Sequence, residues 1–362
     1  MRFIPDIGPV QETVSDIFVP DATDRKLLLA LASDARASIA KLSKECRANR
    51  DTVAYRLQRF DENKILAGTR ALIDVGKLGY DAYHIFLKLR NPTPTAEHKM
   101  VEAISKLPFV RAVLKFFGKY DYEIAIVAKS VVEFDERLTQ IIEHAGVALQ
   151  SYEVLVITQS FVARSFPQSF GIASVASNAI SKVASKKKSD SQMLDSIDLA
   201  LLAAIADDAR ATMVSISQKT KVPIDTLIYR LHKLQDWLIL GYSPVVNYAA
   251  LGYSLYAVML DIAQLDKAKE SMIKEFLRSL KHILWAVKTV GASNVLIYVC
   301  VRREQEYHET IAALRNAFPE QIRGFESLSA VAQFKYTLAP QIMFNSDNIV
   351  AQNKSKQKNS NA

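Results

Sequence analysis

The feature that most constrains this chain is an internal duplication. The segment that begins at Asp24, DRKLLLALASDARASIAKLSKECRANRDTVAYRLQRFDENKIL, aligns without a gap with the segment that begins at Asp198, DLALLAAIADDARATMVSISQKTKVPIDTLIYRLHKLQDWLIL. After a one-residue change of register the likeness continues, with Leu-Gly-Tyr at both 78–80 and 251–253. The repeat is much longer than the roughly 20–50 residues of a solenoid repeat. It therefore indicates tandem duplication of a whole two-domain unit.

Each repeat begins with a short helical segment and continues as strand, helix, strand, strand, helix, strand. Apolar residues three and four apart mark the helices, and alternating apolar residues mark the strands. The second part has the order of a split βαβ, or ferredoxin-like, domain. The sequence thus predicts an α+β fold class in six segments: winged helix-turn-helix 20–76, ferredoxin-like domain 77–161, linker 162–193, winged helix-turn-helix 194–249, ferredoxin-like domain 250–338 and disordered polar tail 339–362.

The helical segment of the first repeat has the spacing of a helix-turn-helix. Residues 21–33 predict one helix, Ser38 can cap a second, and Asn49 can cap a third that starts near Arg50. The third helix carries an apolar stripe of Val53, Leu57 and Phe60. Residues 69–74, TRALID, then read as a strand that could form a wing. Helix, tight turn and helix is an arrangement that can enter the DNA major groove.

The side of the third helix opposite that stripe is polar and basic. Arg and Gln side chains can read base edges bidentately, and further Arg side chains can hold phosphates. The second repeat begins this helix with Pro223-Ile224 where the first has Asn49-Arg50, which predicts weaker or differently specific DNA contact there. The expected DNA-binding residues are Arg47, Asn49, Arg50, Asp51, Thr52, Tyr55, Arg56, Gln58, Arg59, Lys221, Asp225, Thr226, Tyr229, Arg230 and Lys233.

The ferredoxin-like pattern leaves one face of its sheet to be covered. Strand residues such as Ile85, Leu87, Ile124 and Ile126 supply apolar side chains to both faces. An uncovered apolar sheet predicts association with another sheet. Because the second repeat lies on the same chain, we expect the two sheets to pair with each other.

Composition narrows the class of protein. The chain has 49% hydrophobic and 23% charged residues, and its formal net charge of +8 suits a polyanionic partner such as double-stranded DNA. Its two cysteines, Cys46 and Cys300, exclude a disulfide framework, and their apolar neighbours indicate small buried side chains. No apolar run reaches the roughly 18–20 residues of a membrane span, and the N-terminus does not read as a signal peptide. A cytoplasmic protein is expected.

Motifs that carry catalysis are missing from the sequence. It shows no nucleophile–base pair, no phosphate-binding loop and no metal-ligand spacing. We therefore expect no catalytic residues, no metal, no cofactor and no enzymatic activity.

Several motifs together resemble the Lrp/AsnC, or feast/famine, family of bacterial and archaeal transcription regulators. They cover roughly 21–160 and again 195–337, and comprise Asp24-Arg25-Lys26-Leu27-Leu28, Asp34-Ala35-Arg36-Ala37-Ser38, Thr52-Val53-x-x-Arg56, Ile65-Leu66-x-Gly68, Lys77-Leu78-Gly79 and Gly118-Lys119-Tyr120-Asp121. The resemblance implies a winged helix-turn-helix followed by a ligand-sensing domain that pairs sheet to sheet. Family members usually carry one such unit, dimerise and assemble further. The duplication therefore implies that one chain mimics a dimer and that the chain forms homo-oligomers.

The resemblance also implies an amino-acid effector between the sensor domains. The family site lies near a Gly-x-x-Asp loop, where glycine permits the turn and a carboxylate can hold an α-ammonium group. The second repeat has a neutral amide in place of the aspartate, which predicts poorer ligand binding there. The implied effector-binding residues are Gly118, Tyr120, Asp121, Gly291 and Asn294.

Two other functions stay open. Some proteins of this two-domain build are haem-pathway decarboxylases that act on sirohaem-type porphyrins as paired subunits, and such an enzyme needs cationic and histidine side chains around a large pocket. The six histidines fall mostly at positions expected on helix ends or exposed faces: 84, 98, 144, 232, 282 and 308. Alternatively, the chain is a sensor or interaction protein whose second helix-turn-helix serves only packing, as the change at Pro223-Ile224 suggests.

Overall fold

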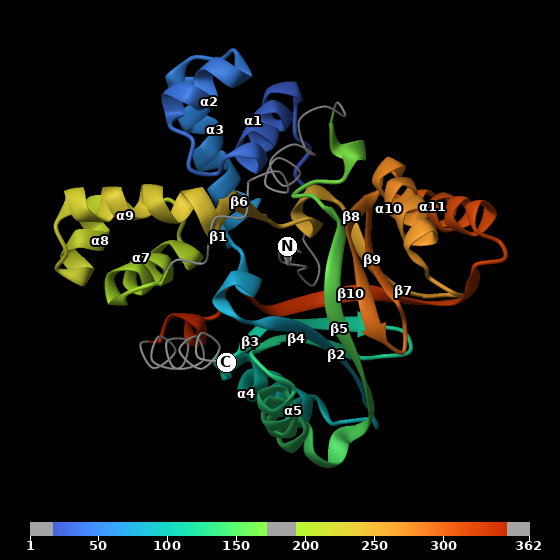
Figure 1. Ribbon diagram of the computed structural model, residues 1–362. Helices are drawn as coiled ribbons and strands as arrows, with labels where there is room; N and C mark the ends of the chain where they lie inside the picture. The colour runs from blue at the N-terminus through green and yellow to red at the C-terminus, as the bar shows by residue number, and fades with distance from the viewer. Residues whose placement is uncertain (1–16, 172–192, 346–362) are drawn as a thin grey trace.

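The computed structural model describes residues 17–171 and 193–345 and shows two units of the same element order (Figure 1). The first unit comprises α1 (Ala22–Ser33), α2 (Ile39–Cys46), α3 (Arg50–Glu62), β1 (Leu66–Ile73), η1 (Val75–Leu78), β2 (Asp81–Leu89), α4 (Pro94–Lys106), β3 (Val110–Phe117), β4 (Tyr122–Ala128), α5 (Val131–Ala145), η2 (Gly146–Ala148), β5 (Leu149–Ala163) and η3 (Gln168–Phe170). The second comprises α7 (Ser196–Asp207), α8 (Met213–Thr220), α9 (Ile224–Trp237), β6 (Ile239–Val246), η4 (Ala249–Leu251), β7 (Ser254–Ile262), α10 (Lys267–Ser279), β8 (Ile283–Gly291), β9 (Val295–Val301), α11 (Glu304–Ala317), β10 (Ile322–Tyr336) and η5 (Gln341–Phe344). The α+β fold class predicted from the sequence is confirmed.

Side-chain caps explain where the helices of the helix-turn-helix domains begin. Asp21 accepts hydrogen bonds from the backbone N–H groups of Thr23 and Asp24 at the start of α1, and Asp195 caps α7 in the same way. Such a cap is worth about 1 kcal/mol. Asn49 caps α3, whereas Pro223 provides no side-chain cap for α9. Pro223, which stands in the second repeat where the first has Asn49, therefore leaves α9 without the side-chain cap that α3 has.

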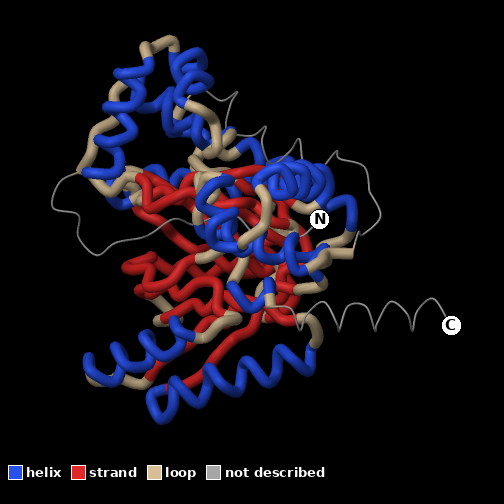
Figure 2. The backbone as a smooth tube through the Cα atoms, turned by 90° about the vertical axis from the view of Figure 1, so that its left-hand side faces the viewer, coloured by secondary structure: helices blue, strands red, loops and turns tan. Residues whose placement is uncertain are grey.

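The two ferredoxin-like sheets join edge to edge into a closed barrel of strand order β10-β3-β4-β2-β5-β8-β9-β7. Two seams connect the units: β5 pairs with β8, with Leu155 opposite Gly291, and β10 pairs with β3, with Ser329 opposite Phe117. The expected association of the sheets thus takes the form of a barrel, which leaves no unpaired sheet edge. Figure 2 shows the strands gathered in one block, with a pair of helices along its lower side.

The strand expected as a wing pairs with its counterpart in the other unit. β1 and β6 form a two-stranded antiparallel sheet, with Arg70 opposite Ser243. Each strand also reaches the neighbouring helix-turn-helix: Ala35 N–H donates to the Tyr242 carbonyl at 3.2 Å, and Ala209 N–H donates to the Thr69 carbonyl at 2.9 Å. A single ribbon therefore holds the two helix-turn-helix domains next to each other (Figure 1).

The stretches expected as linker and tail contain ordered, buried segments. β5 runs to Ala163, and after it Arg164 donates from its guanidinium to the carbonyls of Ile283 and Arg278 on the second unit. Phe170 is 1% exposed. In the expected tail, η5 packs against α7 and Met343 is buried. The rest of both stretches, 172–192 and 346–362, lies outside the described residues.

Candidate nucleic-acid interface

One side of α3 packs into the first helix-turn-helix domain and the other side faces outward. Val53 and Phe60 are fully buried, as the apolar stripe predicted. The outward side carries Arg50, Asp51, Tyr55 and Gln58, all exposed, and Tyr55 keeps 65% of its surface. Exposed donors on the second helix of a helix-turn-helix are the chemistry that direct base readout requires.

The turn before α3 adds a further cation to this surface. Arg47 ends α2 in the left-handed conformation with φ 54° and is exposed. Asn49 is also exposed, but its side-chain oxygen accepts the Thr52 N–H at 2.7 Å, and Thr52 is half-buried. Gln58 donates to Glu62 at 2.8 Å, so base contact by Gln58 would exchange that bond for a new one. Among the arginines of the first domain's expected contacts, Arg47 and Arg50 thus have fewer internal ties than Arg56 and Arg59.

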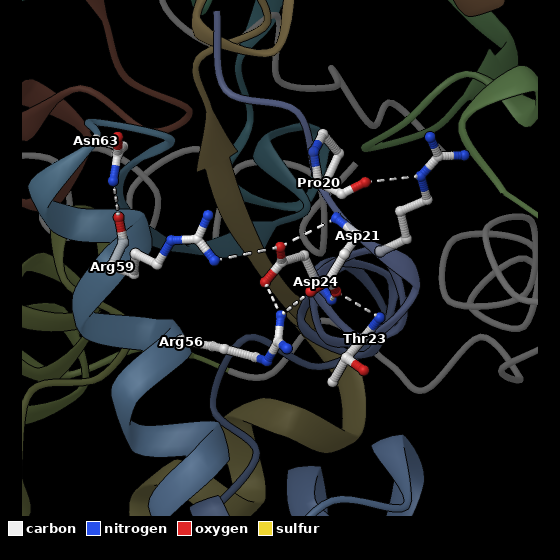
Figure 3. A network of polar contacts seen from close by, with 8 residues as sticks. Pro20, Asp21, Thr23, Asp24, Arg56, Arg59 and Asn63 are labelled. Atoms are coloured by element: carbon white, nitrogen blue, oxygen red, sulfur yellow. Dashed lines mark hydrogen bonds and ion pairs between the residues drawn. The ribbon is translucent and has the colours of Figure 1, made fainter.

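Arg56 is turned away from this surface into the domain (Figure 3). Its Nη1 lies 2.8 Å from Asp21 Oδ2 and 2.5 Å from Asp24 Oδ1, and its side chain is 18% exposed. Arg59 lies beside the same pair, 3.8 Å from Asp24, with its guanidinium 4.8 Å from the centre of the Phe18 ring. Because buried Asp24 needs a cationic partner, Arg56 serves to tie α3 to α1. The sequence expectation that Arg56 contacts phosphate does not agree with this geometry.

The second domain repeats the same tie. Arg230 Nη1 lies 2.8 Å from Asp195 and 3.1 Å from buried Asp198. Burial opposes ionisation of Asp195, but hydrogen bonds from backbone N–H groups and the nearby Arg230 charge outweigh it and lower the pKa of this carboxyl. Arg230 therefore joins α9 to α7, and its position also departs from the expected DNA contact.

The outward face of α9 differs in chemistry from that of α3. Tyr229 is 66% exposed, much as Tyr55 is, and Asp225 and Lys221 are exposed too. Thr226 and Lys233 are half-buried. The face also carries two exposed apolar side chains, Ile224 and Ile228.

The expected effector residues lie at the ends of β3 and β8, the strands that take part in the two seams of the barrel. Asp121 Oδ2 accepts the Leu89 N–H at 2.7 Å and lies 3.3 Å from Lys88 Nζ. In the second unit the equivalent side chain, that of Asn294, also binds a strand backbone. It accepts a hydrogen bond from Ile262 N–H at 2.9 Å and donates one to Ile262 O at 2.7 Å. Both side chains therefore close the end of a strand. A ligand ammonium at Asp121 would share a carboxylate that already has partners.

The two loop glycines allow the units to approach closely. A Cβ on Gly118 would lie 2.8 Å from Leu328 Cδ2, and one on Gly291 would lie 2.2 Å from the Val154 carbonyl oxygen. In each case the neighbour belongs to the other unit. Tyr120, by contrast, is 3% exposed and packs its ring near Phe86 inside the barrel. Glycine is thus needed at these sites for the seam itself.

Sequence reasoning missed a polar cluster inside the barrel. His84 Nδ1 and the Tyr298 hydroxyl both bond to the carboxylate of Glu123, and all three side chains are buried. The Trp285 ring lies 5.4 Å from that of His84. The repeat held the signal that could have found it, because the aligned positions in the opposite unit are small or apolar: Ala257, Leu296, Ala125 and Ala112.

Two smaller expectations concern the cysteines and the membrane. Cys46 and Cys300 are both buried free thiols, and burial raises the pKa of each. They are small core side chains, as expected. Among the described residues, no helix combines the length and apolar character needed to cross a lipid bilayer.

Comparison with known proteins assigns families to both helical domains. Residues 21–60 match the AsnC-type helix-turn-helix domain, and residues 194–236 match a winged helix-turn-helix DNA-binding domain. The regulatory protein AsnC of Haemophilus influenzae is 25% identical over 144 residues, which are 40% of this chain and 95% of that protein. The proline dehydrogenase transcriptional activator of Rhodobacter capsulatus is 24% identical over 144 residues, 40% of this chain and 89% of the activator.

A likeness in fold extends over both units at once. The crystal structure of the siroheme decarboxylase NirDL superposes with a TM-score of 0.57, covering 92% of this chain and 100% of that one. At 10% sequence identity the likeness concerns the fold alone. It shows that this arrangement of two joined units occurs in a solved structure.

Proposed function

We propose that this chain, a tandem-duplicated protein of the Lrp/AsnC family of DNA-binding transcription regulators, binds a specific double-stranded DNA sequence as the single-chain counterpart of a dimer. The observation that carries the proposal is the β1–β6 ribbon with one helix-turn-helix domain on each strand. In a dimeric reader, symmetry places two such domains side by side for two half-sites. Here the covalent duplication and the ribbon take over that task.

The chemistry of DNA contact falls to a small set of side chains on the first domain. Arg50 sits in the first turn of α3, where a guanidinium can donate two hydrogen bonds to guanine O6 and N7. Arg47, at the turn before it, is suited to hold a phosphate and set the register. The positive helix N-terminus adds to the attraction for phosphate. Tyr55 and Gln58 extend the same face along the groove.

Titration of DNA affinity against salt tests the proposal. The full chain should bind a subset of genomic fragments, with log affinity falling linearly with log salt. Arg47→Ala should lower the slope of log affinity against log salt by about one unit. Arg50→Ala should reduce the discrimination between bases at one position of the site by about 1–3 kcal/mol. Arg90→Ala removes an exposed cation from the ferredoxin-like domain and serves as the control. Binding that is absent, or indifferent to salt and to Arg47 and Arg50, would contradict the proposal.

An effector and a higher assembly belong to the finer part of the proposal. An amino acid would bind at a seam near Gly118 and Asp121, with its ammonium sharing the carboxylate that now faces Lys88. A thermal-shift screen of amino acids, on the wild type and on Asp121→Asn, tests this, because a ligand held through the carboxylate should stabilise only the wild type. Light scattering on the full chain gives the number of copies in the homo-oligomer.

The alternative, a haem-pathway decarboxylase, has one observation in its favour: His84 lies inside a barrel whose fold resembles that of NirDL. The groups packed around His84 argue against it. Glu123 contributes a carboxyl group where the carboxylates of a sirohaem-type porphyrin need cations, and Trp285 and Tyr298 supply no cation. Incubation with sirohaem, followed by absorbance and mass spectrometry, distinguishes the two functions.

A further inference from the structure

The outward faces of the two recognition helices carry different chemistry at equivalent positions. Ile224 occupies the place that Arg50 holds in α3, and Ile228 occupies the place of Ala54. The two isoleucines lie one helical turn apart on the same face. They keep 38% and 40% of their surface exposed, whereas Leu227 and Leu231, which adjoin them on the side of α9 that packs into the domain, are buried.

The surroundings of these isoleucines match those of the residues they replace. Tyr229 beside them is as exposed as Tyr55, and Lys221 stands at the turn before α9 in the same left-handed conformation as Arg47. Single exposed apolar side chains are ordinary on protein surfaces. Here two such side chains lie together at the start of a recognition helix. Lys221 beside them is placed to hold a phosphate, so their surroundings are those of a surface that contacts DNA.

Chemistry limits what such a surface can read. In the major groove the C5-methyl of thymine is the one apolar group on the base edges, and apolar side chains contact it. An isoleucine cannot donate to guanine O6 and N7 as Arg50 can. A helix that presents Ile224 and Ile228 therefore favours thymine-containing base pairs.

We propose that the second helix-turn-helix recognises thymine methyl groups through Ile224 and Ile228, so that the DNA site of this chain is not a palindrome. One half-site presents guanine to Arg50, and the other presents thymines to α9. This inference rests on the proposed function above. It adds the kind of base that each half of the chain selects.

The barrel keeps the two unlike helices in one molecule and in one arrangement. Identical subunits carry identical recognition helices, so their sites mirror the two-fold symmetry of the protein. In this chain Glu123 of one unit meets Tyr298 of the other, and the reciprocal positions are Leu296 and Ala125. The pairing of two different halves is built into the interior, so the recognition helices were free to diverge.

The test begins with selection of bound duplexes from a randomised pool by the full chain. Each thymine of the selected site is then replaced by deoxyuridine, which removes only the C5-methyl. The wild type should lose affinity about fourfold for each methyl that α9 contacts, the change expected for one buried CH₂-sized group. Replacements in the half-site read by Arg50 should have no effect of this kind.

Variants assign the effect to its side chains. The double variant Ile224→Ala/Ile228→Ala should bind thymine and deoxyuridine sites equally well, while Val214→Ala, an exposed apolar position on α8, should respond as the wild type does. A palindromic selected site, or a wild type indifferent to deoxyuridine, overturns the inference and leaves DNA binding standing. A change of oligomer mass in the isoleucine variants without a change in the deoxyuridine response also overturns it, in favour of a protein contact. Failure of the wild type to select any duplex overturns the proposed function itself.

Discussion

The hydroxyl of Tyr298, in the second unit, donates a hydrogen bond to the buried carboxylate of Glu123, in the first unit. Burial is the main cause that raises the pKa of Tyr298 well above its usual 10, and the neighbouring carboxylate of Glu123 raises it further. The hydroxyl therefore keeps its proton and remains a donor at neutral pH. The bond spans the barrel interior from one unit to the other. It is a direct polar link between the two units.

Removal of this donor should destabilise the whole barrel. Tyr298→Phe leaves Glu123 without one of its partners in a buried site, which should lower the free energy of unfolding by about 1–3 kcal/mol. Urea denaturation followed by far-UV circular dichroism measures the loss. Tyr307→Phe is the matched control, because its hydroxyl contacts the uncharged Ser327 at a partly buried site and should cost less. Equal losses in the two variants would contradict a special role for the cross-unit bond.

A second prediction separates the arginines that hold the fold from those that we propose to contact DNA. Arg56→Ala leaves buried Asp24 without its closest cation, so it should lower the free energy of unfolding by about 1–3 kcal/mol. Arg47→Ala removes an exposed side chain and should change stability by less than about 0.5 kcal/mol. Thermal unfolding measures the first effect, and the salt dependence of DNA binding measures the second. An Arg56→Ala variant of wild-type stability with a reduced salt slope would return Arg56 to the DNA interface.

A third prediction concerns acid. Burial opposes ionisation of Asp21, but hydrogen bonds from Asp24 N–H and from Arg56 outweigh it, so the pKa of Asp21 lies below its usual 3.8 in the folded chain. A carboxyl with a lowered folded pKa contributes stability that is present above the unfolded pKa and is lost as pH falls through the folded one. Asp195 has the same shift. Both helix-turn-helix domains should therefore weaken below about pH 4.

Thermal unfolding of the wild type and of two variants at a series of pH values tests this prediction. Asp21→Ser and Asp195→Ser keep a side-chain oxygen at the N-cap but remove the titrating charge. Their unfolding midpoints should fall less steeply than those of the wild type between pH 5 and pH 3, roughly the range in which the carboxyls take up protons. Parallel slopes in wild type and variants would show that other carboxyls govern acid unfolding. Because Asp21 is half exposed, solvent screening keeps the effect of each site small.

Local sequence patterns predicted the elements better than the contacts between units. β3, β4 and β7 follow the order of strands and helices that alternation predicted for the two ferredoxin-like domains, because pleat and burial are local properties. β5 and β10 have 15 residues each, and their last residues pair with β8 and β3 across the seams. Nothing in the periodicity of a strand reveals a partner in another unit.

For the candidate interface too, the sequence predicted local features but not contacts between separate elements. Helical periodicity correctly predicted that Arg50 and Tyr55 face outward. It wrongly predicted the same for Arg56, because the partners of Arg56, Asp21 and Asp24, belong to another helix and its N-cap. The repeat did contain a clue, since the same three residue types recur as Asp195, Asp198 and Arg230. Two acids and an arginine retained together in both repeats are typical of an internal tie. The role of Asp121 was hidden for the same reason, because its partner Leu89 belongs to a neighbouring strand.

The last prediction tests the seams through their glycines. Both positions have positive φ, 150° at Gly118 and 146° at Gly291, which side chains adopt only with strain. At Gly118 the nearest obstacle to a Cβ is the movable end of Leu328, whereas at Gly291 it is a backbone oxygen only 2.2 Å away. Gly291→Ala should therefore lower the free energy of unfolding by more than about 3 kcal/mol, and Gly118→Ala by about 1–3 kcal/mol. Gly324→Ala, in β10 with open space around it, is the control for loss of a glycine. A lower denaturant midpoint for Gly118→Ala than for Gly291→Ala would mean that the seam between β5 and β8 yields more easily than its backbone contact implies.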